Sequence, residues 1–317
     1  MHKFAALGVR AGMGLWAGVV LVCGSSVATG QTYQITQVAG TDFTEVRNSS
    51  NQLLATYTQG CYTVTLAGSS RMFAEPSSTA ATVTHSTWVR VLPAPFNGTV
   101  DQAWLTARLA DTSPDMLKIG MQYIAKAPAI KSGNVQIAGD ASYGPLQADG
   151  TRQEGSDFND YLGATWTYPT GTDAPETDQF RCLDCSGMVR MIYGYRGNIP
   201  LILDPDGLRL PRRSFQIYAS APGKQVIVNT GVQATDLSKL RIGDLVFFDA
   251  DTGDGTQLDH VGVHLGLDSA GASRFLSSRK SIDGPTMGDK APNGINTYSY
   301  LNGGGYYAKA FRCSRRL

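Results

Sequence analysis

The sequence contains few charged residues and few histidines, and both scarcities argue against particular classes of function. Charged residues make up 17% of the 317, and 27 basic side chains nearly balance 26 acidic ones. No run of Lys or Arg forms a basic stripe, which argues against a nucleic-acid partner. The sequence also lacks a His-Glu-x-x-His segment and a second Cys-x-x-Cys pair. It therefore carries no familiar zinc motif, and we predict no metal and no cofactor.

Long apolar runs are also lacking, and the one near the N-terminus is too short to cross a bilayer. Lys3 and Arg10 precede an apolar run over residues 11–23, and Ser26-Val27-Ala28 fits a small-x-small cleavage pattern. A membrane-spanning helix needs about 20 apolar residues. We therefore interpret residues 1–28 as a secretory signal peptide, which predicts a secreted or periplasmic protein without a stable membrane anchor. A lipoprotein signal ending at Cys23 is the weaker alternative.

Composition divides the rest of the chain into two regions. Short segments rich in Thr, Val, Tyr and Leu, punctuated by Gly, Ser, Asn and Pro, predict a β-rich region over residues 31–110. This region is either an accessory domain or an extension packed on one larger domain. Helical spacing over residues 113–128, a loop-like stretch over 129–180, a helix near Cys185 and several later strands follow. This order predicts an α+β domain over residues 111–317, with helices packed on an antiparallel sheet.

The segment "RCLDCSGMVRMIYGYRG" places a cysteine at the start of a predicted helix. Met188, Val189 and Ile192 recur at helical spacing after Cys185, and Asp184 is available as the N-cap. A helix N-terminus and a neighbouring imidazolium both lower the pKa of a thiol. We therefore predict that Cys185 is a thiolate nucleophile.

The sequence leaves other roles for the cysteines open. Export to an oxidising compartment predicts a disulfide, but the sequence does not say which cysteines pair. A redox Cys-x-x-Cys pair lacks the βαβ context that such motifs have. The cysteines available beyond the signal peptide are Cys61, Cys182, Cys185 and Cys313.

Three histidines beyond the signal peptide are candidate partners for the thiol. His260 and His264 lie on one predicted strand, where residues i and i+4 share a face. His85 lies in the β-rich region and is interpreted as a solvent-facing strand residue. His260 and His264 together with Cys182 and Cys185 have a spacing that permits a metal site, but no further motif supports one.

Three segments in order resemble the NlpC-type family of bacterial cell-wall cysteine peptidases. They are "DCSGMVRMIYGY", "LSKLRIGDLVFFD" and "LDHVGVHLG", and the final "YYAKAFRCSRRL" is similar to the family's last strand. The resemblance extends over roughly residues 113–317. It implies a papain-like NlpC-type catalytic domain of the α+β class, preceded here by the small β-rich N-terminal region.

The resemblance also implies roles for individual residues. Cys185 would be the nucleophile and His260 the base, since His260 begins the His-Val-Gly motif. Ser277 occupies the third catalytic position, where relatives most often have His. The residues implied around the substrate are Asp184 and Ser186, at its amino end, and Tyr143.

The function implied is that of a secreted, cell-wall-associated cysteine peptidase. It would hydrolyse amide bonds of peptidoglycan stem peptides near the D-glutamyl–diamino acid bond. Two alternatives stay open: a Cys-His hydrolase or acyltransferase that acts on another amide or thioester, and a catalytically silent wall-binding protein. The inserts "DADTGDGTQ" and "KSIDGPTMGDKAPNG" are interpreted as hairpin loops, because "DTGDG" lacks the ligand spacing of a calcium loop.

Overall fold

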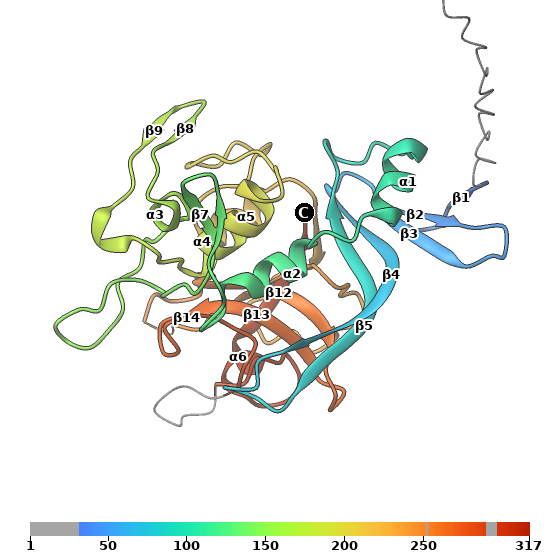
Figure 1. Ribbon diagram of the computed structural model, residues 1–317. Coiled ribbons are helices and arrows are strands. Elements are labelled where there is room, and N and C mark those ends of the chain that lie inside the picture. The colour runs from blue at the N-terminus through green and yellow to red at the C-terminus, as the bar shows by residue number, and fades with distance from the viewer. Residues whose placement is uncertain (1–31, 252, 290–296) are drawn as a thin grey trace, which may run out of the picture. The chain divides into compact units, whose positions relative to one another are not determined.

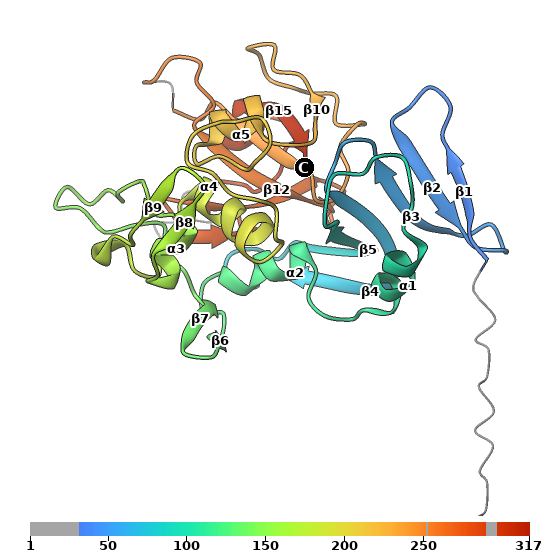
Figure 2. The same cartoon turned by 90° about the horizontal axis from the view of Figure 1, so that it is seen from above.

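The computed structural model describes residues 32–251, 253–289 and 297–317, and residues 33–317 form one compact unit. The signal peptide predicted for residues 1–28 lies outside the described residues. Within them, helices are mixed with antiparallel sheet, as the sequence predicts (Figures 1 and 2). None of the described helices has both the length and the apolar character that a bilayer crossing requires.

An antiparallel five-stranded sheet forms the N-terminal part and confirms its predicted β-rich character. Its strands follow one another in the order of the chain, and the helix α1 (Gln102–Ala110) packs against it through Leu105. The side chain of Asp101 caps α1 by accepting a hydrogen bond from the backbone N–H of Trp104 at 3.0 Å. The strands are β1 (Gln34–Gln37), β2 (Phe43–Arg47), β3 (Leu53–Thr58), β4 (Thr63–Ala74) and β5 (Thr82–Val91).

The segment predicted as a helix over residues 113–128 is much shorter in the structure. Asp115, not Ser113, is the N-cap, and its carboxylate accepts from Lys118 N, pairs with Arg71 and accepts from Val89 N. One carboxylate thus starts the helix and ties it to the N-terminal sheet. The helical turns here are α2 (Met116–Gly120) and the 3-10 turn η1 (Met121–Tyr123).

The stretch predicted as loop-like over residues 129–180 contains small elements of its own. Asp157 and Asp160 form a capping box at the start of its one α-helix among the described residues. The elements are β6 (Ile130–Ser132), β7 (Val135–Ala138), α3 (Phe158–Leu162), β8 (Trp166–Tyr168), β9 (Gly171–Asp173) and the 3-10 turn η2 (Thr177–Gln179).

A six-stranded antiparallel sheet forms the C-terminal part, in the order β10-β15-β11-β12-β13-β14. The helix α6, over residues that the sequence suggested as part of a strand, packs against this sheet through Tyr307. The strands are β10 (Lys224–Ile227), β11 (Leu245–Phe248), β12 (His260–Leu267), β13 (Ser273–Arg279), β14 (Gly284–Thr286) and β15 (Phe311–Arg316). The helices are α4 (Cys185–Val189), the π-helix η3 (Arg190–Tyr195), α5 (Ser214–Ser220) and α6 (Tyr306–Ala310).

Side chains cover both faces of the central strands, which explains why β11 and β12 are nearly continuously apolar. Met188 and Val189 of α4 share one core cluster with Val261 and Val263 of β12. Phe248 and Phe275, which belong to a second cluster, pack with the α6 and β15 side chains Tyr307, Ala310 and Phe311.

Backbone hydrogen bonds join the two sheets. Thr63 N donates to Leu317 O at 2.8 Å, and Ser269 N donates to Thr82 O at 2.7 Å. The division of the chain near residue 110 stays a prediction, since both sheets belong to the same compact unit.

The predicted disulfide is absent among the cysteines that the structure describes. Cys61 Sγ donates to Arg316 O at 3.6 Å and Cys182 Sγ to Phe180 O at 3.8 Å, so each thiol has a backbone partner of its own. Burial raises the pKa of Cys61 to about 12 and that of Cys182 to about 11. All four described cysteines, Cys61, Cys182, Cys185 and Cys313, are free and buried.

Candidate active site

Cys185 is the first residue of α4, as the sequence predicts, and the local packing explains the helix start. Asp184 has extended backbone geometry, and its carboxylate accepts a hydrogen bond from Gly187 N at 2.7 Å. A Cβ at Gly187 would lie 2.2 Å from the backbone oxygen of Ser156. Only glycine therefore allows the first turn of α4 to lie this close to the neighbouring chain.

The thiol of Cys185 is free and lies against the start of β12. Cys185 is 4% exposed, and its Sγ donates to Asp259 O at 3.8 Å, the carbonyl of the residue just before His260. Burial, reinforced by the carboxylate of Asp184, raises the pKa of the thiol well above its ordinary value. Both effects oppose the lowering of the thiol pKa that the helix start predicts, and the role of Cys185 as a thiolate nucleophile stays a prediction.

His260 is the first residue of β12 and is buried among aromatic rings. Its ring centroid lies 5.1 Å from that of Tyr307 and 5.6 Å from that of Phe248. Its Nε2 is buried and has no hydrogen-bond partner among the described residues. Burial, followed by the positive charge of Arg279, lowers the pKa of His260 to about 3. The ring is therefore a neutral imidazole at pH 7 and can accept a proton.

The other two histidines, His264 and His85, make their contacts with other residues. His264 is buried, and its ring nitrogens contact Arg241 O at 3.0 Å and Ser273 Oγ at 2.8 Å, beside a cavity of about 490 Å³. His85 does lie on a strand, but it is half-buried against Phe73 rather than solvent-facing, because the ring centroids are 5.5 Å apart.

Ser277, the predicted third catalytic residue, is fully buried on β13 and engaged with a cation. Its Oγ accepts a hydrogen bond from Arg279 Nε at 2.9 Å. The neighbouring Ser278 Oγ donates to Leu183 O at 2.5 Å, which ties β13 to the segment before Cys185. No motif in the sequence points to Arg279.

Asp184 and Ser186, predicted around the substrate, share a partner, Arg212, that no sequence pattern predicts. Arg212 donates to Asp184 Oδ2 and to Ser186 Oγ, each at 2.7 Å. The Arg212 charge helps to hold the pKa of Asp184 below its ordinary value, against the effect of burial. Arg212 lies far along the chain from "DCSG" in a segment without a motif, so no local signal points to it.

Tyr143 is buried near Cys185 and Asp184. It is 4% exposed, and its backbone N–H donates to Asp283 Oδ1 at 3.0 Å. Burial first, and then the charges of Cys185 and Asp184, raise the pKa of its hydroxyl. All six predicted site residues are therefore buried, and Tyr143 lies within the electrostatic range of the thiol.

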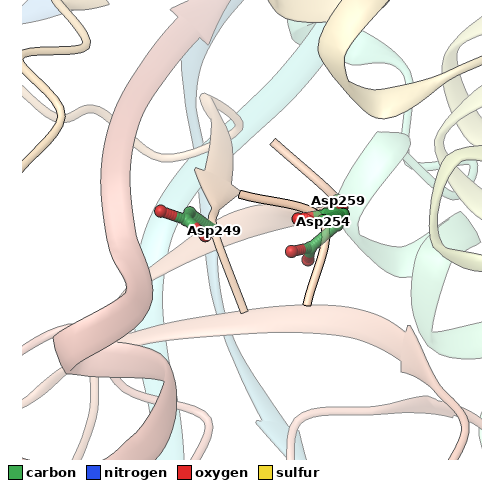
Figure 3. A group of neighbouring side chains, drawn as sticks. All are labelled: Asp249, Asp254 and Asp259. Atoms are coloured by element: carbon green, nitrogen blue, oxygen red, sulfur yellow. The ribbon is translucent and has the colours of Figure 1, made fainter. Parts of the chain in front are cut away.

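Three carboxylates gather in the insert between β11 and β12, which the sequence predicts as a hairpin loop. Ligand-capable oxygens of Asp249, Asp254 and Asp259 lie within 4.8 Å of one another (Figure 3). Protein donors already occupy two of them: Arg312 pairs with Asp249 at 3.1 Å, and Asp259 accepts from two backbone N–H groups. Burial raises the pKa of Asp259 to about 6. We assign no metal role to this group.

Comparisons with known proteins show what the segment around the site is similar to. A helix that begins with a buried cysteine, packed on an antiparallel sheet whose strand begins with histidine, fits a thiol hydrolase. Residues 166–285 match the model of the NlpC/P60 family, which confirms the resemblance over that segment. Proteins of this family are generally cell-wall peptidases.

One solved structure is also similar to this chain. It is described as similar to a lipoprotein of the NLP/P60 family, from Staphylococcus aureus subsp. aureus Mu50, with a TM-score of 0.29 and 16% identity. The match covers 72% of this chain and 50% of that chain, so the chain spans about half of that protein's length. No curated protein matches.

Proposed function

We propose that this protein is a secreted cysteine peptidase that cuts amide bonds in the stem peptides of peptidoglycan, near the D-glutamyl–diamino acid bond. The observation that carries the proposal is the position of Cys185. Its free thiol starts α4 and contacts the backbone next to His260, within the segment that matches the NlpC/P60 model. A papain-like arrangement of helix and sheet around these two residues is part of the same proposal.

The proposed reaction uses Cys185 as nucleophile and His260 as base. The sulfur bonds to the carbonyl carbon while its proton passes to the imidazole, and the carbonyl electrons move to oxygen. The backbone N–H of Cys185, in the first turn of α4, has no acceptor within the helix and is the donor that we propose for that oxyanion. The imidazolium then protonates the leaving amine as the C–N bond breaks. Water, deprotonated by neutral His260, hydrolyses the thioester.

The substrate-binding roles of Asp184, Ser186 and Tyr143 belong to this proposal as well. Asp184 and Ser186 flank the nucleophile and share Arg212. Tyr143 contributes a buried hydroxyl close enough to feel the charge on Cys185. Together they offer the carboxylate and hydroxyl groups that an amino end of a peptide requires.

Mass spectrometry of purified peptidoglycan digested by the mature protein tests the proposal. The expected products end at the D-glutamyl residue and begin at the diamino acid. Cys185→Ala and His260→Ala should each abolish release, because each removes a group that bonds to the reacting atoms or the transferred proton.

Cys182→Ala is the matched control, since it removes a second buried thiol only three residues away. Release of the same peptides by Cys185→Ala would refute the proposal. Cleavage of a different amide or thioester would favour the broader Cys-His hydrolase, and tight binding to walls without turnover would favour the silent wall-binding protein.

A further inference from the structure

A cavity of about 490 Å³ lies between the N-terminal sheet and the C-terminal sheet, and neither Cys185 nor His260 lines it. The β12 residues that do line it begin at His264, four positions after His260. Pockets that bind small molecules have volumes of about 300–1,000 Å³. The cavity is therefore large enough to hold a ligand, and the proposed reaction makes no use of it.

Three threonines of the N-terminal sheet form one wall of this cavity. Thr56 pairs directly with Thr65, and Thr65 pairs with Val89. Thr87 lies two residues before Val89 on β5, so its side chain is on the same face of the sheet as the other two. Among the described residues, none of the three hydroxyls has a hydrogen-bond partner. The wall therefore offers three hydroxyls that a ligand can bind.

Arg241 adds a cation to the lining, and its backbone is held in place by a buried histidine. The imidazole of His264 donates from Nδ1 to Arg241 O at 3.0 Å, because a carbonyl oxygen can only accept. Its Nε2 then accepts from Ser273 Oγ at 2.8 Å. The guanidinium carbon of Arg241 lies 3.9 Å from the ring centroid of Phe43 on β2. Arg241 is thus positioned before any ligand arrives.

The guanidinium of Arg241 has no ion pair and no hydrogen bond within the part of the chain that the structure describes. Asp244 and Glu45 are the carboxylates whose charges reach it. Asp244 already pairs with Arg316 at 2.7 Å. Glu45 already pairs with Arg47 at 2.7 Å. None of the described residues that line the cavity is Asp or Glu, so the lining favours an anionic ligand.

Apolar side chains form much of the remaining lining. Leu53 and Leu267 are 40% and 64% exposed, so the apolar lining extends to the protein surface. A second cavity of about 210 Å³ shares Leu53, Thr56 and Thr65 with the first, and the space therefore continues along the N-terminal sheet. The other apolar residues of the lining are Leu237, Leu240 and Ile242.

We propose that this cavity is a second binding site, which takes the carboxyl end of a peptide whose last side chain is apolar. The terminal carboxylate binds the guanidinium of Arg241, a geometry that allows two parallel hydrogen bonds. The last side chain packs on the leucines of the lining. The site is separate from the proposed peptidase chemistry and goes beyond it.

The hydrogen-bonding groups of the lining favour a peptide over a fatty acid, which has the same charge and an apolar body. The threonine hydroxyls can bind the N–H and C=O groups of the peptide. Asn302 Oδ1 accepts from Ser273 N at 2.5 Å, so the amide NH₂ of Asn302 is the group left for a ligand. An alkyl chain would cover these polar groups without bonding to them, which is unfavourable.

Titration of the mature protein with N-acetyl-leucyl-leucine, followed by backbone amide signals in NMR spectra, tests the proposal. We expect a dissociation constant of about 1 mM or lower, with the largest shifts around Thr65 and Arg241. The C-terminal amide of the same dipeptide lacks the carboxylate and should bind about tenfold more weakly. Octanoate keeps the carboxylate but lacks peptide groups, and it should also bind more weakly than the dipeptide.

Variants of the cation identify the site. Arg241→Met should weaken binding of the dipeptide acid about tenfold and change binding of its amide little. Arg241→Lys should keep part of the affinity, because it retains the charge but not the planar fork. Arg213→Met is the matched control, since it removes an exposed arginine that does not line the cavity. It should bind the dipeptide as the wild type does.

Equal binding of the acid and the amide by the wild-type protein would overturn the proposal, and this comparison needs no variant to fold. Absence of binding up to about 10 mM dipeptide, or shifts confined to the surroundings of Cys185, would overturn it as well. So would tighter binding of octanoate than of the dipeptide, or full affinity in a folded Arg241→Met protein. Equilibrium binding needs no turnover, so failure of this inference is distinguishable from failure of the proposed peptidase activity.

Discussion

Gly187→Ala should damage both stability and catalysis, because the added carbon has no space. Its Cβ would lie 2.2 Å from Ser156 O and 3.1 Å from Asp157 Cα, and both of these atoms belong to backbone. Carbon and oxygen atoms approach to about 3.3 Å without bonding. The first turn of α4 must therefore move by about 1 Å, and Cys185 and the Asp184 cap move with it.

The expected magnitude follows from that displacement. Overpacking of a well-packed interior costs about 1–3 kcal/mol, and a reacting group misplaced by about 1 Å can lose about 100-fold in rate. Urea denaturation measures the free energy of unfolding of Gly187→Ala, and peptide release from peptidoglycan measures its activity.

Gly304→Ala is the matched control, since the nearest atom to its Cβ is the Lys309 side chain at 3.7 Å. It should change both quantities little. A Gly187→Ala protein as stable and as active as the wild type would show that α4 tolerates displacement, and the reasoning about its start would be wrong.

Other predictions follow from the same contacts. Arg212→Met should cost about 3–5 kcal/mol in urea denaturation, because it leaves Asp184 buried without its cation; Arg209→Met, in a half-exposed pair, should cost under ~1 kcal/mol. Below pH 6.5 the His260 ring is protonated in the unfolded chain, but it stays neutral in the folded protein, where its pKa is about 3. Stability should therefore fall by about 3 kcal/mol between pH 7 and pH 4, and less in His260→Gln. Iodoacetamide should alkylate Cys185 more slowly than glutathione at pH 7, since the thiol is buried and protonated; faster reaction would contradict this.

Local sequence patterns predicted those parts of the site that depend on neighbouring residues. Helical spacing after Cys185 and the capping role of Asp184 fixed the start of α4, and the strand that begins at His260 was visible as "HVGVHLG". The antiparallel sheet and the β-rich N-terminal part followed from the same kind of spacing.

Features that depend on distant contacts were not predictable in this way. Arg212 and Arg279 reach the site from segments without a recognisable motif, and the raised pKa of Cys185 depends on burial that the sequence does not display. The helix predicted to begin at Ser113 starts later because Asp115, which also binds the N-terminal sheet, is its N-cap. The predicted disulfide failed because each described thiol lies in separate, closely packed surroundings.

The position of β15 has a consequence for how this protein is made. The strand Phe311–Arg316 lies between β10 and β11 and pairs with both, although it follows them in the chain. Until the ribosome has synthesised it, those two strands lack their common neighbour and their edges stay open. The sheet that carries His260 is thus completed only after β15 has been synthesised, and loss of even this short segment would split it in two.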